Sequence, residues 1–508
     1  MKQKISLDRR TFLESAAVPL AFTIVPRHVL GGPGYVSPND KLTLGYIGCG
    51  TQGLREMFRL VANPEVQIVA VCDPEKDNTN YLEWSKDEIR NSIRKLLEKP
   101  AWGEGVKGVR CGRDVAREVV TTYYAQKRSA ETYKGCASYA DFRELLEKEK
   151  GLDAVKVMTP DHLHATIAIA AMKKGKHVAT HKPIANRVSE VRMVVETARR
   201  TGVATHLLAY HNPSPSGVKE MIDNGAIGTL REVHDWTDRP FWPQYDSLPT
   251  ETPPIPPTFD WNLWLGPALD RPYHPNYTHT VFRGWYDFGG GSIADMGNYS
   301  LLPVFLNLDL QLPVSVEALT SSSVEVLDQI CGVKLNDFSF PHACQLRLKF
   351  AAAGNRPAID LYWYDGGMRP YAPDALEADN KPVPATGTMY VGDKGVILGN
   401  QIHPEKRRRE YMTGREVPEA TARRGYAGDS EWVTAFKGGK PSGGNFISAG
   451  NCAETICLGG AAIRYARMNF NEGRTTGPLE YDAQNMKFTN RPEANPHLVR
   501  EYRKGWEL

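Results

Sequence analysis

Cysteine is sparse in this chain, and its spacing argues against a common kind of metal site. The 508 residues contain eight cysteines, none of them in a Cys-x-x-Cys pair. Repeated short cysteine pairs are the usual signature of structural zinc. His162 and His164 do not have the geometry of a metal-binding pair either, so we predict no bound metal. Cys49 and Cys72 are expected to be small buried residues.

A surplus of charge of one sign is also missing. The chain has 62 basic and 59 acidic residues, a net charge of +3. Without a broad basic field, nucleic acid and anionic membrane surfaces are not expected partners. The basic run at 406–409 is followed by Glu410 and is expected to lie on a solvated loop. The length predicts about two or three domains, and no internal repeat is visible.

No uncharged stretch near the N-terminus is long enough to span a membrane. The segment 15–26 is shorter than the about 20 residues that a spanning helix needs. It follows Arg9 and Arg10 in the sequence R-R-T-F-L, which resembles a twin-arginine export signal. We expect a signal and linker over 1–40, export to the periplasm and no membrane span in the mature protein. The alternative is a chance arginine pair on an unstructured terminus.

A glycine-rich turn between a strand and a helix is the most informative motif. The sequence from Leu42 is L-T-L-G-Y-I-G-C-G-T-Q-G. Gly48 permits the tight turn, Gly50 lets backbone amides approach a pyrophosphate, and Gly53 lets the helix pack on the strand. The helix N-terminus favours phosphate. The expected dinucleotide-binding turn comprises Gly48, Cys49, Gly50, Thr51, Gln52 and Gly53.

An acidic residue follows at the distance that selects the cofactor. A second apolar strand, 66–72, ends at Asp73, roughly 20 residues beyond the glycines. A carboxylate there accepts both hydroxyls of the adenine ribose and repels a 2′-phosphate. NAD is therefore the expected cofactor, and NADP is disfavoured. The alternative is a glycine-rich turn with a surface Asp.

Alternating strands and helices in the first half predict a doubly wound parallel sheet, a Rossmann fold. A charged segment, about 78–135, is expected to add surface helices without a chemical role. The predicted strands are 42–48, 66–72, 153–158, 176–180 and 203–210.

The pattern changes after Gly228. Apolar and polar residues alternate over 344–350, which is typical of a sheet with one covered face. The Pro- and Trp-rich segment 240–275 predicts a long ordered loop. Helices near 429–437 and 449–468 are expected to cover a sheet face or return to the first domain. The predicted strands are 230–238, 314–322, 342–351, 358–363 and 387–397.

These patterns give a division of the chain into consecutive parts. We expect a Rossmann domain, a crossover, a domain built on an antiparallel sheet for substrate binding and oligomerisation, and a C-terminal extension. Their ranges are 41–183, 184–228, 229–470 and 471–508.

Two motifs point to a known family. The chain reads T-P-D-H-L-H-A from Thr159 and, after a helix, G-K-H-V-A-T-H-K-P up to Pro183. A strand leading into Lys182 and Pro183, with Pro160 and His164 upstream, resembles the Gfo/Idh/MocA family of sugar oxidoreductases. The family motif is usually E-K-P, so the acid that would orient the lysine is missing here.

The second motif is a glycine run followed by Asp-x-Gly. It runs from Gly289 to Tyr299, with Asp295 within it. Most relatives have His at the position of Tyr299 and Asp at that of Leu302, whereas an exported founding member uses Tyr for proton transfer. The resemblance spans about 42–468. It implies a C-terminal α/β domain on a large open, mostly antiparallel sheet. Because the face of such a sheet is open, we expect a homo-oligomer formed through it. The resemblance also implies that Pro160, His164 and Lys182 contact the cofactor.

Oxidising a secondary alcohol leaves a proton that some group must accept. A nearby ammonium favours the phenolate of a tyrosine, so Lys182 and Tyr299 together are expected to form the base. Asp295 is expected to hold the lysine or a sugar hydroxyl. The alternative role for Tyr299 is packing as a buried residue.

Arginine and aromatic side chains suit the hydroxyls and ring faces of sugars. Each is also explained by core or loop packing. The predicted substrate-binding residues are Arg283, Trp285, Arg239, His211 and Asn298, and further candidates for the pocket are Trp242, Trp261, Trp264, Tyr210 and Asn212.

The sequence therefore predicts an exported NAD-dependent oxidoreductase acting on a sugar, glycoside or cyclitol, with a bound and internally recycled cofactor. Two alternatives remain open. One is a glycoside hydrolase that oxidises the sugar ring transiently. The other is a carbohydrate-binding relative without turnover. This alternative stays open because the chain departs from the family pattern at His181, Tyr299 and Leu302.

Overall fold

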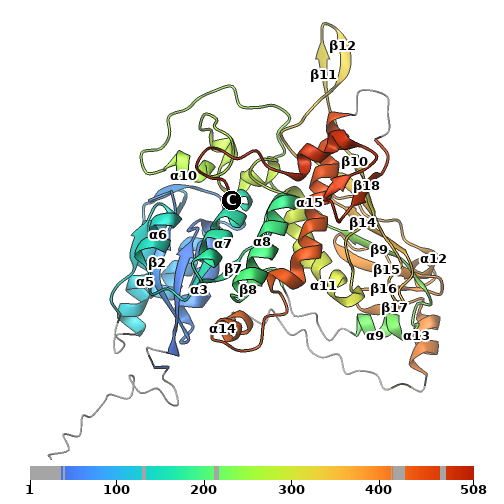
Figure 1. Cartoon of the computed structure of the whole chain (residues 1–508), viewed down its shortest axis with the longest axis horizontal. Coiled ribbons are helices and arrows are strands. Elements are labelled where there is room, and N and C mark those ends of the chain that lie inside the picture. The colour runs from blue at the N-terminus through green and yellow to red at the C-terminus, as the bar shows by residue number, and fades with distance from the viewer. Residues whose placement is uncertain are drawn as a thin grey trace, which may run out of the picture.

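The computed structural model describes residues 36–37, 40–128, 133–210, 217–413, 415, 429–469 and 476–508. Arg9 and Arg10, the core of the proposed export signal, lie outside these residues, as do the candidate substrate residues His211 and Asn212. Figure 1 shows two sheets side by side, the first in blue to green and the second mainly in yellow to orange, with long helices between them.

The first sheet is a six-stranded Rossmann sheet with all of its neighbouring strands parallel. The five predicted strands are present, and a sixth, β5, has three residues and was missed. The order β5-β2-β1-β6-β7-β8 reverses direction between β1 and β6, where such folds open a ligand crevice. The strands are β1 (Leu42–Ile47), β2 (Val66–Cys72), β5 (Ala137–Tyr139), β6 (Ala154–Val157), β7 (His177–Thr180) and β8 (Thr205–Leu207).

Apolar periodicity explains how the helices cover this sheet. In α3 (Thr51–Ala62) the buried positions include Leu54, Met57 and Val61, which share one helix face. α7 (His164–Lys173) is almost wholly buried because α8 (Val188–Thr201) packs beside it. The glycine-rich turn therefore sits between a buried strand and a helix that is fixed against the sheet.

The segment 78–135 is more than a surface addition, so that prediction was partly wrong. It forms an antiparallel pair of strands, β3 (Asn78–Tyr81) and β4 (Val109–Cys111), with α4 (Glu88–Leu97) between them and α5 (Arg113–Lys127) after them. Tyr124 of α5 is buried in the Rossmann core and accepts a hydrogen bond from the amide of Ile68 at 3.0 Å. α5 is thus part of the domain's covering layer.

The second sheet has nine strands, and every neighbouring pair is antiparallel except β14 with β9. The predicted strand 387–397 is wrong as a single element, because the chain turns at 393–395 and pairs back on itself. The strands in spatial order are β17 (Gln401–His403), β16 (Val396–Leu398), β15 (Gly387–Gly392), β9 (Leu230–Trp236), β14 (Ile359–Tyr364), β13 (Cys344–Phe350), β10 (Ser315–Thr320), β18 (Leu479–Asp482) and β19 (Lys487–Phe488).

One long helix joins the two halves. α15 (Phe446–Met468) contacts both α8 and β10, so it packs against the two domains at once. It is long and apolar enough to cross a bilayer, but 72% of its most apolar stretch is buried inside the structure, as in a core helix. α14 (Ser430–Phe436) places Trp432 and Phe436 in the Rossmann core, so this part of the chain returns to the first domain.

Three other segments differ from the sequence predictions. The segment 240–275 contains a short helix, α10 (Trp261–Leu265). The basic run lies on α13 (Glu405–Met412) rather than on a loop, although that helix has no buried residue. The part beyond residue 471 supplies β18 and β19 to the edge of the second sheet.

Candidate active site

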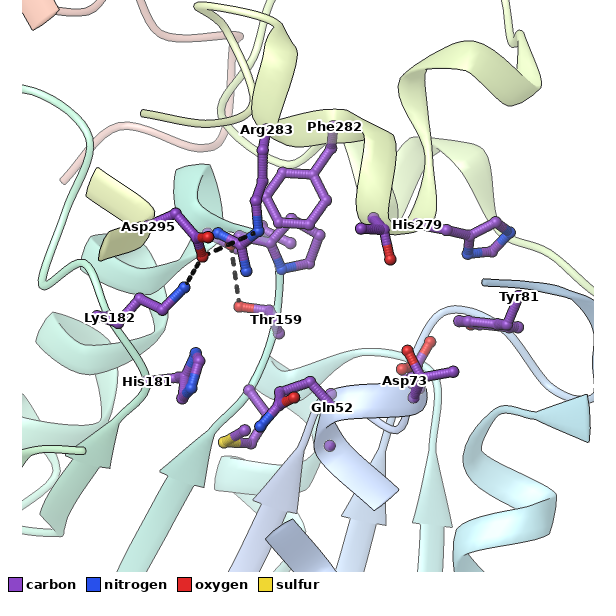
Figure 2. Close-up of a pocket in the computed structure, with 18 of the residues that line it drawn as sticks. Gln52, Asp73, Tyr81, Thr159, His181, Lys182, His279, Phe282, Arg283 and Asp295 are labelled. Atoms are coloured by element: carbon purple, nitrogen blue, oxygen red, sulfur yellow. Dashed lines mark hydrogen bonds and ion pairs between the residues drawn. The ribbon is translucent and has the colours of Figure 1, made fainter. Parts of the chain in front are cut away.

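A large cavity lies at the carboxyl ends of β1, β2 and β6, where the second domain covers the Rossmann sheet (Figure 2). Its volume is roughly 1260 Å³, open space at its mouth included. Its lining comes from both domains. It comprises Gly48, Gly50, Thr51, Gln52, Gly53, Asp73, Pro74, Tyr81, Trp84, Met158, Thr159, Pro160, Leu163, His181, Lys182, Arg239, Phe259, Trp264, His279, Thr280, Phe282, Arg283, Asp295, Met296 and Tyr299.

The glycine turn at one end of the cavity needs its glycines. Gly48 has a φ of +100°, and a Cβ there would lie 2.5 Å from the carbonyl carbon of Met158. A Cβ on Gly53 would lie 2.2 Å from the oxygen of Gly48. The first turn of α3 carries no side-chain cap and no acidic residue, so its backbone amides remain available to an anion. Cys49 is fully buried and does not line the cavity.

Asp73 is held in place by the backbone. One of its carboxylate oxygens accepts a hydrogen bond from the amide of Cys49 at 2.6 Å, and the other accepts one from Glu75 at 2.8 Å. Each oxygen keeps a second lone pair for a ligand hydroxyl. Burial raises the pKa of Asp73 to about 6, so the group is charged at neutral pH.

Two rings from distant parts of the chain meet beside Asp73. Tyr81, at the end of β3, and His279, at the start of the short helix η4 (His279–Gly284), have ring centroids 4.0 Å apart. Trp84 lines the same end and is 52% exposed. The sequence interpretation gave this segment no chemical role. The aromatic pair Tyr81 and Trp84 was the available signal.

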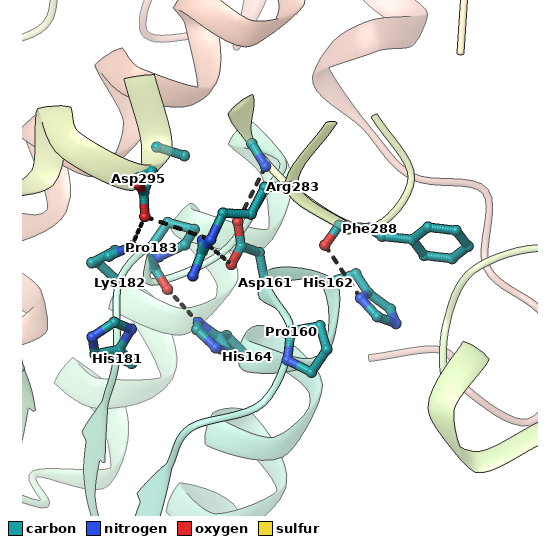
Figure 3. A network of polar contacts seen from close by, with 12 residues as sticks. Pro160, Asp161, His162, His164, His181, Lys182, Pro183, Arg283, Phe288 and Asp295 are labelled. Atoms are coloured by element: carbon teal, nitrogen blue, oxygen red, sulfur yellow. Dashed lines mark hydrogen bonds and ion pairs between the residues drawn. The ribbon is translucent and has the colours of Figure 1, made fainter. Parts of the chain in front are cut away.

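Four charged side chains form a buried network at the other end (Figure 3). Lys182 pairs with Asp295, and Arg283 Nε lies 3.5 Å from the same Asp295 oxygen. Arg283 also donates a hydrogen bond to Asp161 at 3.2 Å, and Asp161 accepts another from the amide of Gly290 at 3.1 Å. Two members come from each domain. The acid missing from the H-K-P motif is thus supplied by Asp295 of the second domain.

The glycine run makes this network possible. A Cβ on Gly289 would lie 2.5 Å from the Cα of Arg283, so only glycine permits this close approach. The run leads into a short π-helical turn, η5 (Ile293–Gly297), which carries Asp295. Such turns are frequent at functional sites. The local fold therefore brings Arg283 and Asp295 to one point above Lys182.

Burial and charge set the protonation states of this network. Burial raises the pKa of Asp295, but the charges of Lys182 and Arg283 outweigh this effect and lower it, so Asp295 stays ionised. Burial, and then the positive charge of Arg283, lowers the pKa of Lys182. Burial and the neighbouring Lys182 hold the pKa of His181 well below its usual value, so its imidazole is neutral.

Tyr299 does not match the predicted base. Its hydroxyl lies 3.3 Å from His181 Nε2, while Lys182 Nζ lies over the ring face, 5.6 Å from its centroid. Burial, and then the charge of Asp295, raises the pKa of Tyr299, so the group is a neutral phenol. The predicted phenolate stabilised by Lys182 is therefore wrong. The lysine charge is directed to Asp295, and burial disfavours a charged tyrosine.

Some predicted substrate residues do not reach the cavity. Trp285 is fully buried and donates its indole hydrogen to the oxygen of Asn276 at 2.7 Å. Asn298 is buried and donates to the oxygen of Ala294 at 2.8 Å. Both predictions are wrong for this structure because these side chains pack in the interior. Arg239 and Arg283 do line the cavity.

Of the remaining predicted residues, some line the cavity and others do not. Pro160 lines the cavity, but His164 is buried beneath it, with its ring nitrogens facing the carbonyls of Pro183 at 2.5 Å and Thr159 at 2.8 Å. His164 thus positions the turn at Pro183 and does not itself face the cavity. Trp264 lines the cavity, whereas Trp242, Trp261 and Tyr210 do not. Sequence reasoning missed Asp161, Thr159, Phe282 and Thr280.

Comparison with known families gives this geometry a context. Residues 109–208 match a model described as the oxidoreductase family, NAD-binding Rossmann fold, and residues 216–357 match one described as the oxidoreductase family, C-terminal alpha/beta domain. Both models belong to Gfo/Idh/MocA. The chain carries both domains of the Gfo/Idh/MocA oxidoreductase family. The Rossmann domain is accordingly an NAD-binding domain, and the expected fold class is confirmed.

Curated relatives align over part of the chain. A dTDP-3,4-didehydro-2,6-dideoxy-alpha-D-glucose 3-reductase of Streptomyces violaceoruber is 35% identical over 109 residues, 21% of this chain and 31% of the relative. Levoglucosan dehydrogenase of Pseudarthrobacter phenanthrenivorans is 31% identical over 20% of this chain and 28% of the relative. A glycosyl hydrolase family 109 protein of Solibacter usitatus is 29% identical over 32% and 29%. The alignments therefore span about a third of the length of these relatives.

Solved structures are similar at low identity. The WlbA dehydrogenase of Bordetella pertussis, in complex with NADH and UDP-GlcNAcA, is 13% identical, with a TM-score of 0.48 over 87% of this chain and 99% of that one. Levoglucosan dehydrogenase in complex with NADH and L-sorbose is 15% identical, with a TM-score of 0.46 over 84% and 96%.

Proposed function

We propose that this protein is an NAD-dependent oxidoreductase that transfers a hydride to or from a secondary alcohol carbon of a sugar, glycoside or cyclitol. The observation that carries the proposal is the joining of two sites in one cavity. It contains the glycine turn and Asp73 at one end and Lys182, Asp295 and Tyr299 at the other. Cofactor and substrate groups would therefore meet inside one enclosed space.

The residues present fit a dinucleotide. The uncapped amides at the start of α3 suit the phosphates, and the spare lone pairs of Asp73 suit the ribose hydroxyls. Tyr81 and His279 would flank the adenosine end. When bound, NAD supplies the acceptor or donor of the hydride. The negative charge of Asp73 favours NAD over NADP.

The chain's own groups would handle the proton. We assign its transfer to Tyr299: the phenol accepts the proton of the substrate hydroxyl while it passes its own proton to His181 Nε2, and the reverse steps protonate a ketone. The neutral states of both groups fit these roles. Lys182 and Arg283 place positive charge where negative charge develops on the substrate oxygen. Asp295 fixes both cations in position.

The lining of the reaction end fits a polyhydroxylated ring. Arg239 and Arg283 offer planar sets of donors, and Trp264 and Phe282 offer apolar faces. The names of two relatives, a deoxysugar 3-reductase and a levoglucosan dehydrogenase, support a carbohydrate substrate.

The test begins with the cofactor that copurifies. Mass spectrometry of the molecule released from the purified protein should find NAD or NADH. A screen of deuterated glycosides should then show deuterium transfer to a second sugar or ketosugar without added cofactor, if the bound cofactor is recycled. Tight sugar binding without any hydride exchange would instead establish a binding protein that lacks turnover.

A second candidate is NAD-dependent cleavage of a glycosidic bond through transient oxidation of the ring. Alignments with glycosyl hydrolase family 109 proteins favour it, and one from Shewanella baltica extends over 44% of this chain at 26% identity. Released aglycone, together with deuterium exchange at a ring carbon and no net NADH, would distinguish this reaction from simple dehydrogenation.

We also propose export by the twin-arginine route, supported by Arg9 and Arg10 ahead of a short apolar segment. This route carries folded proteins, so the cofactor would be captured before export. Replacing both arginines by lysine should leave the protein in the cytoplasm. Undiminished export of this variant would refute the signal.

Homo-oligomerisation through the second sheet is proposed as well. Gln345, Arg347 and Lys349 alternate with the buried residues of β13, so one face of this strand is directed away from the core. A second copy is the expected partner for an open sheet face. Light scattering should give a mass above 56.6 kDa, the mass of one chain. A monomer at micromolar concentration would contradict this.

A further inference from the structure

A second, smaller cavity lies between the glycine run and α15. Its volume is roughly 410 Å³, open space at its mouth included, and it shares no lining residue with the cofactor cavity. It is bordered by Gly289 and Gly290, by Asn186 and Arg187 from the segment after Pro183, and by the basic side chains described next.

The charges around this cavity are not balanced. Arg464 of α15 lines it and forms no ion pair or hydrogen bond with any residue that the structure describes. Arg187 lies 3.6 Å from Asp287, but that carboxylate is already paired with Arg271. His497 lines the cavity too, and burial followed by the charges of Arg464 and Arg187 lowers its pKa to about 4. Arg187 thus shares Asp287 with Arg271, and the other carboxylate that acts on Arg187, Glu190, is itself paired with Arg500.

Hydrogen-bond donors here are also left without acceptors. Arg464 Nε and Asn186 Nδ2 are buried and have no partner among the described residues. The Asn186 amide cannot simply reverse, because its oxygen accepts a hydrogen bond from Arg500. Buried donors without acceptors are rare in native proteins and usually mark an unseen ligand or water.

We propose that this cavity binds a small oxyanion of the size of phosphate or sulfate. Guanidinium groups match the geometry of oxyanions, and charged hydrogen bonds to them are strong. A water molecule would satisfy donors but would leave Arg464 without a paired negative charge and Arg187 with only a shared one. The anion would bridge α15 and the segment after Pro183, so its binding should stabilise the folded protein. This site is independent of the proposed reaction.

The test uses the purified full chain in an anion-poor zwitterionic buffer. Melting temperature is followed while sodium phosphate, sulfate or acetate is added at constant ionic strength, and affinity is measured by calorimetry. The variants are Arg464→Gln, Arg464→Lys and Asn186→Asp, of which the last places a negative charge in the cavity. Arg408→Gln is the matched control, because Arg408 lies on exposed α13 in a surface ion pair with Glu405.

The expected result is a saturable rise in melting temperature with phosphate or sulfate and a smaller one with acetate. Arg464→Gln should weaken the affinity about tenfold or more, since charged hydrogen bonds are lost. Arg464→Lys should retain part of the affinity, Asn186→Asp should lose the effect, and Arg408→Gln should keep it. NAD binding by Arg464→Gln, followed by cofactor fluorescence, should match the wild type and show that the variant is folded.

Two results would overturn the proposal. One is a rise that never saturates and is equal in the wild type and Arg464→Gln, which is the general effect of kosmotropic salts. The other is no response of the wild type to any of the three anions.

Discussion

The two ends of the large cavity are built in different ways. The cofactor end is formed mainly by one short stretch of chain, in which Gly48, Gly53 and Asp73 hold positions set by their own backbone contacts. The reaction end takes Asp161 and Lys182 from one domain and Asp295 from the other. Local backbone geometry thus defines the first, and the packing of domains defines the second.

This difference predicts that the reaction end is the more fragile under single substitutions. Asp295→Asn should have the largest effect, since it leaves Lys182 and Arg283 as buried cations without their shared acid. Breaking a buried pair costs about 3–5 kcal/mol of folding free energy. Urea unfolding measures the loss. The control is Asp360→Asn, which removes a more exposed pair with Arg347 worth about 0–1 kcal/mol. Equal losses in the two variants would contradict the interpretation.

Tyr299→Phe should come next and should affect rate rather than stability. The ring remains packed, but the hydroxyl that exchanges the proton is gone. General acid–base catalysis contributes about 10²- to 10⁴-fold, so deuterium transfer should fall by that factor while NAD stays bound. His181→Gln should reduce the rate as well, because the relay loses its acceptor. A loss of less than about threefold in Tyr299→Phe would assign the proton to Lys182 or to His181.

The cofactor end can be tested through its dependence on pH. The pKa of Asp73 is about 6, so its charge is present above that pH and is lost below it. Discrimination against NADP should therefore be full at pH 8 and should weaken at pH 5. Asp73→Asn should bind the two cofactors with affinities within about tenfold of each other. The 2′-phosphate of NADP also titrates near pH 6. The pH dependence of the cofactor preference that remains in Asp73→Asn therefore comes from the cofactor and not from the side chain. A pH dependence equal to that of the wild type would remove Asp73 from the ribose site.

The smallest effect is expected from Tyr81→Ala. The ring beside His279 would contribute stacking worth about 0.5–1.5 kcal/mol, so NAD should bind about twofold to tenfold more weakly. The rate of hydride transfer by the bound cofactor should be unchanged. Tyr371→Ala, at a fully solvated surface tyrosine, is the control and should alter neither quantity. An unchanged affinity in Tyr81→Ala would place the adenosine elsewhere.

The same contrast explains what sequence could predict. The Rossmann strands and the glycine turn follow from apolar runs and local turn chemistry, and both were predicted closely. Asp295 was predicted to hold either Lys182 or a sugar hydroxyl. Sequence alone could not decide between these roles, because a pattern along the chain does not show which acid faces which lysine. Trp285 and Asn298 were both predicted to bind substrate. Their side chains point into the interior, which depends on tertiary packing alone.

The network of Asp161, Lys182, Arg283 and Asp295 also limits how this architecture can be rearranged. Each domain contributes one carboxylate and one cation, and the pairs Lys182–Asp295 and Arg283–Asp161 both cross the contact, so Lys182 and Asp161 each depend on a partner from the other domain. A chimera that joins this Rossmann domain to the second domain of a relative would need a matching acid above Lys182, or it would bury an unpaired charge. The two domains are therefore expected to diverge as a unit, with recombination between them selected against at this one contact.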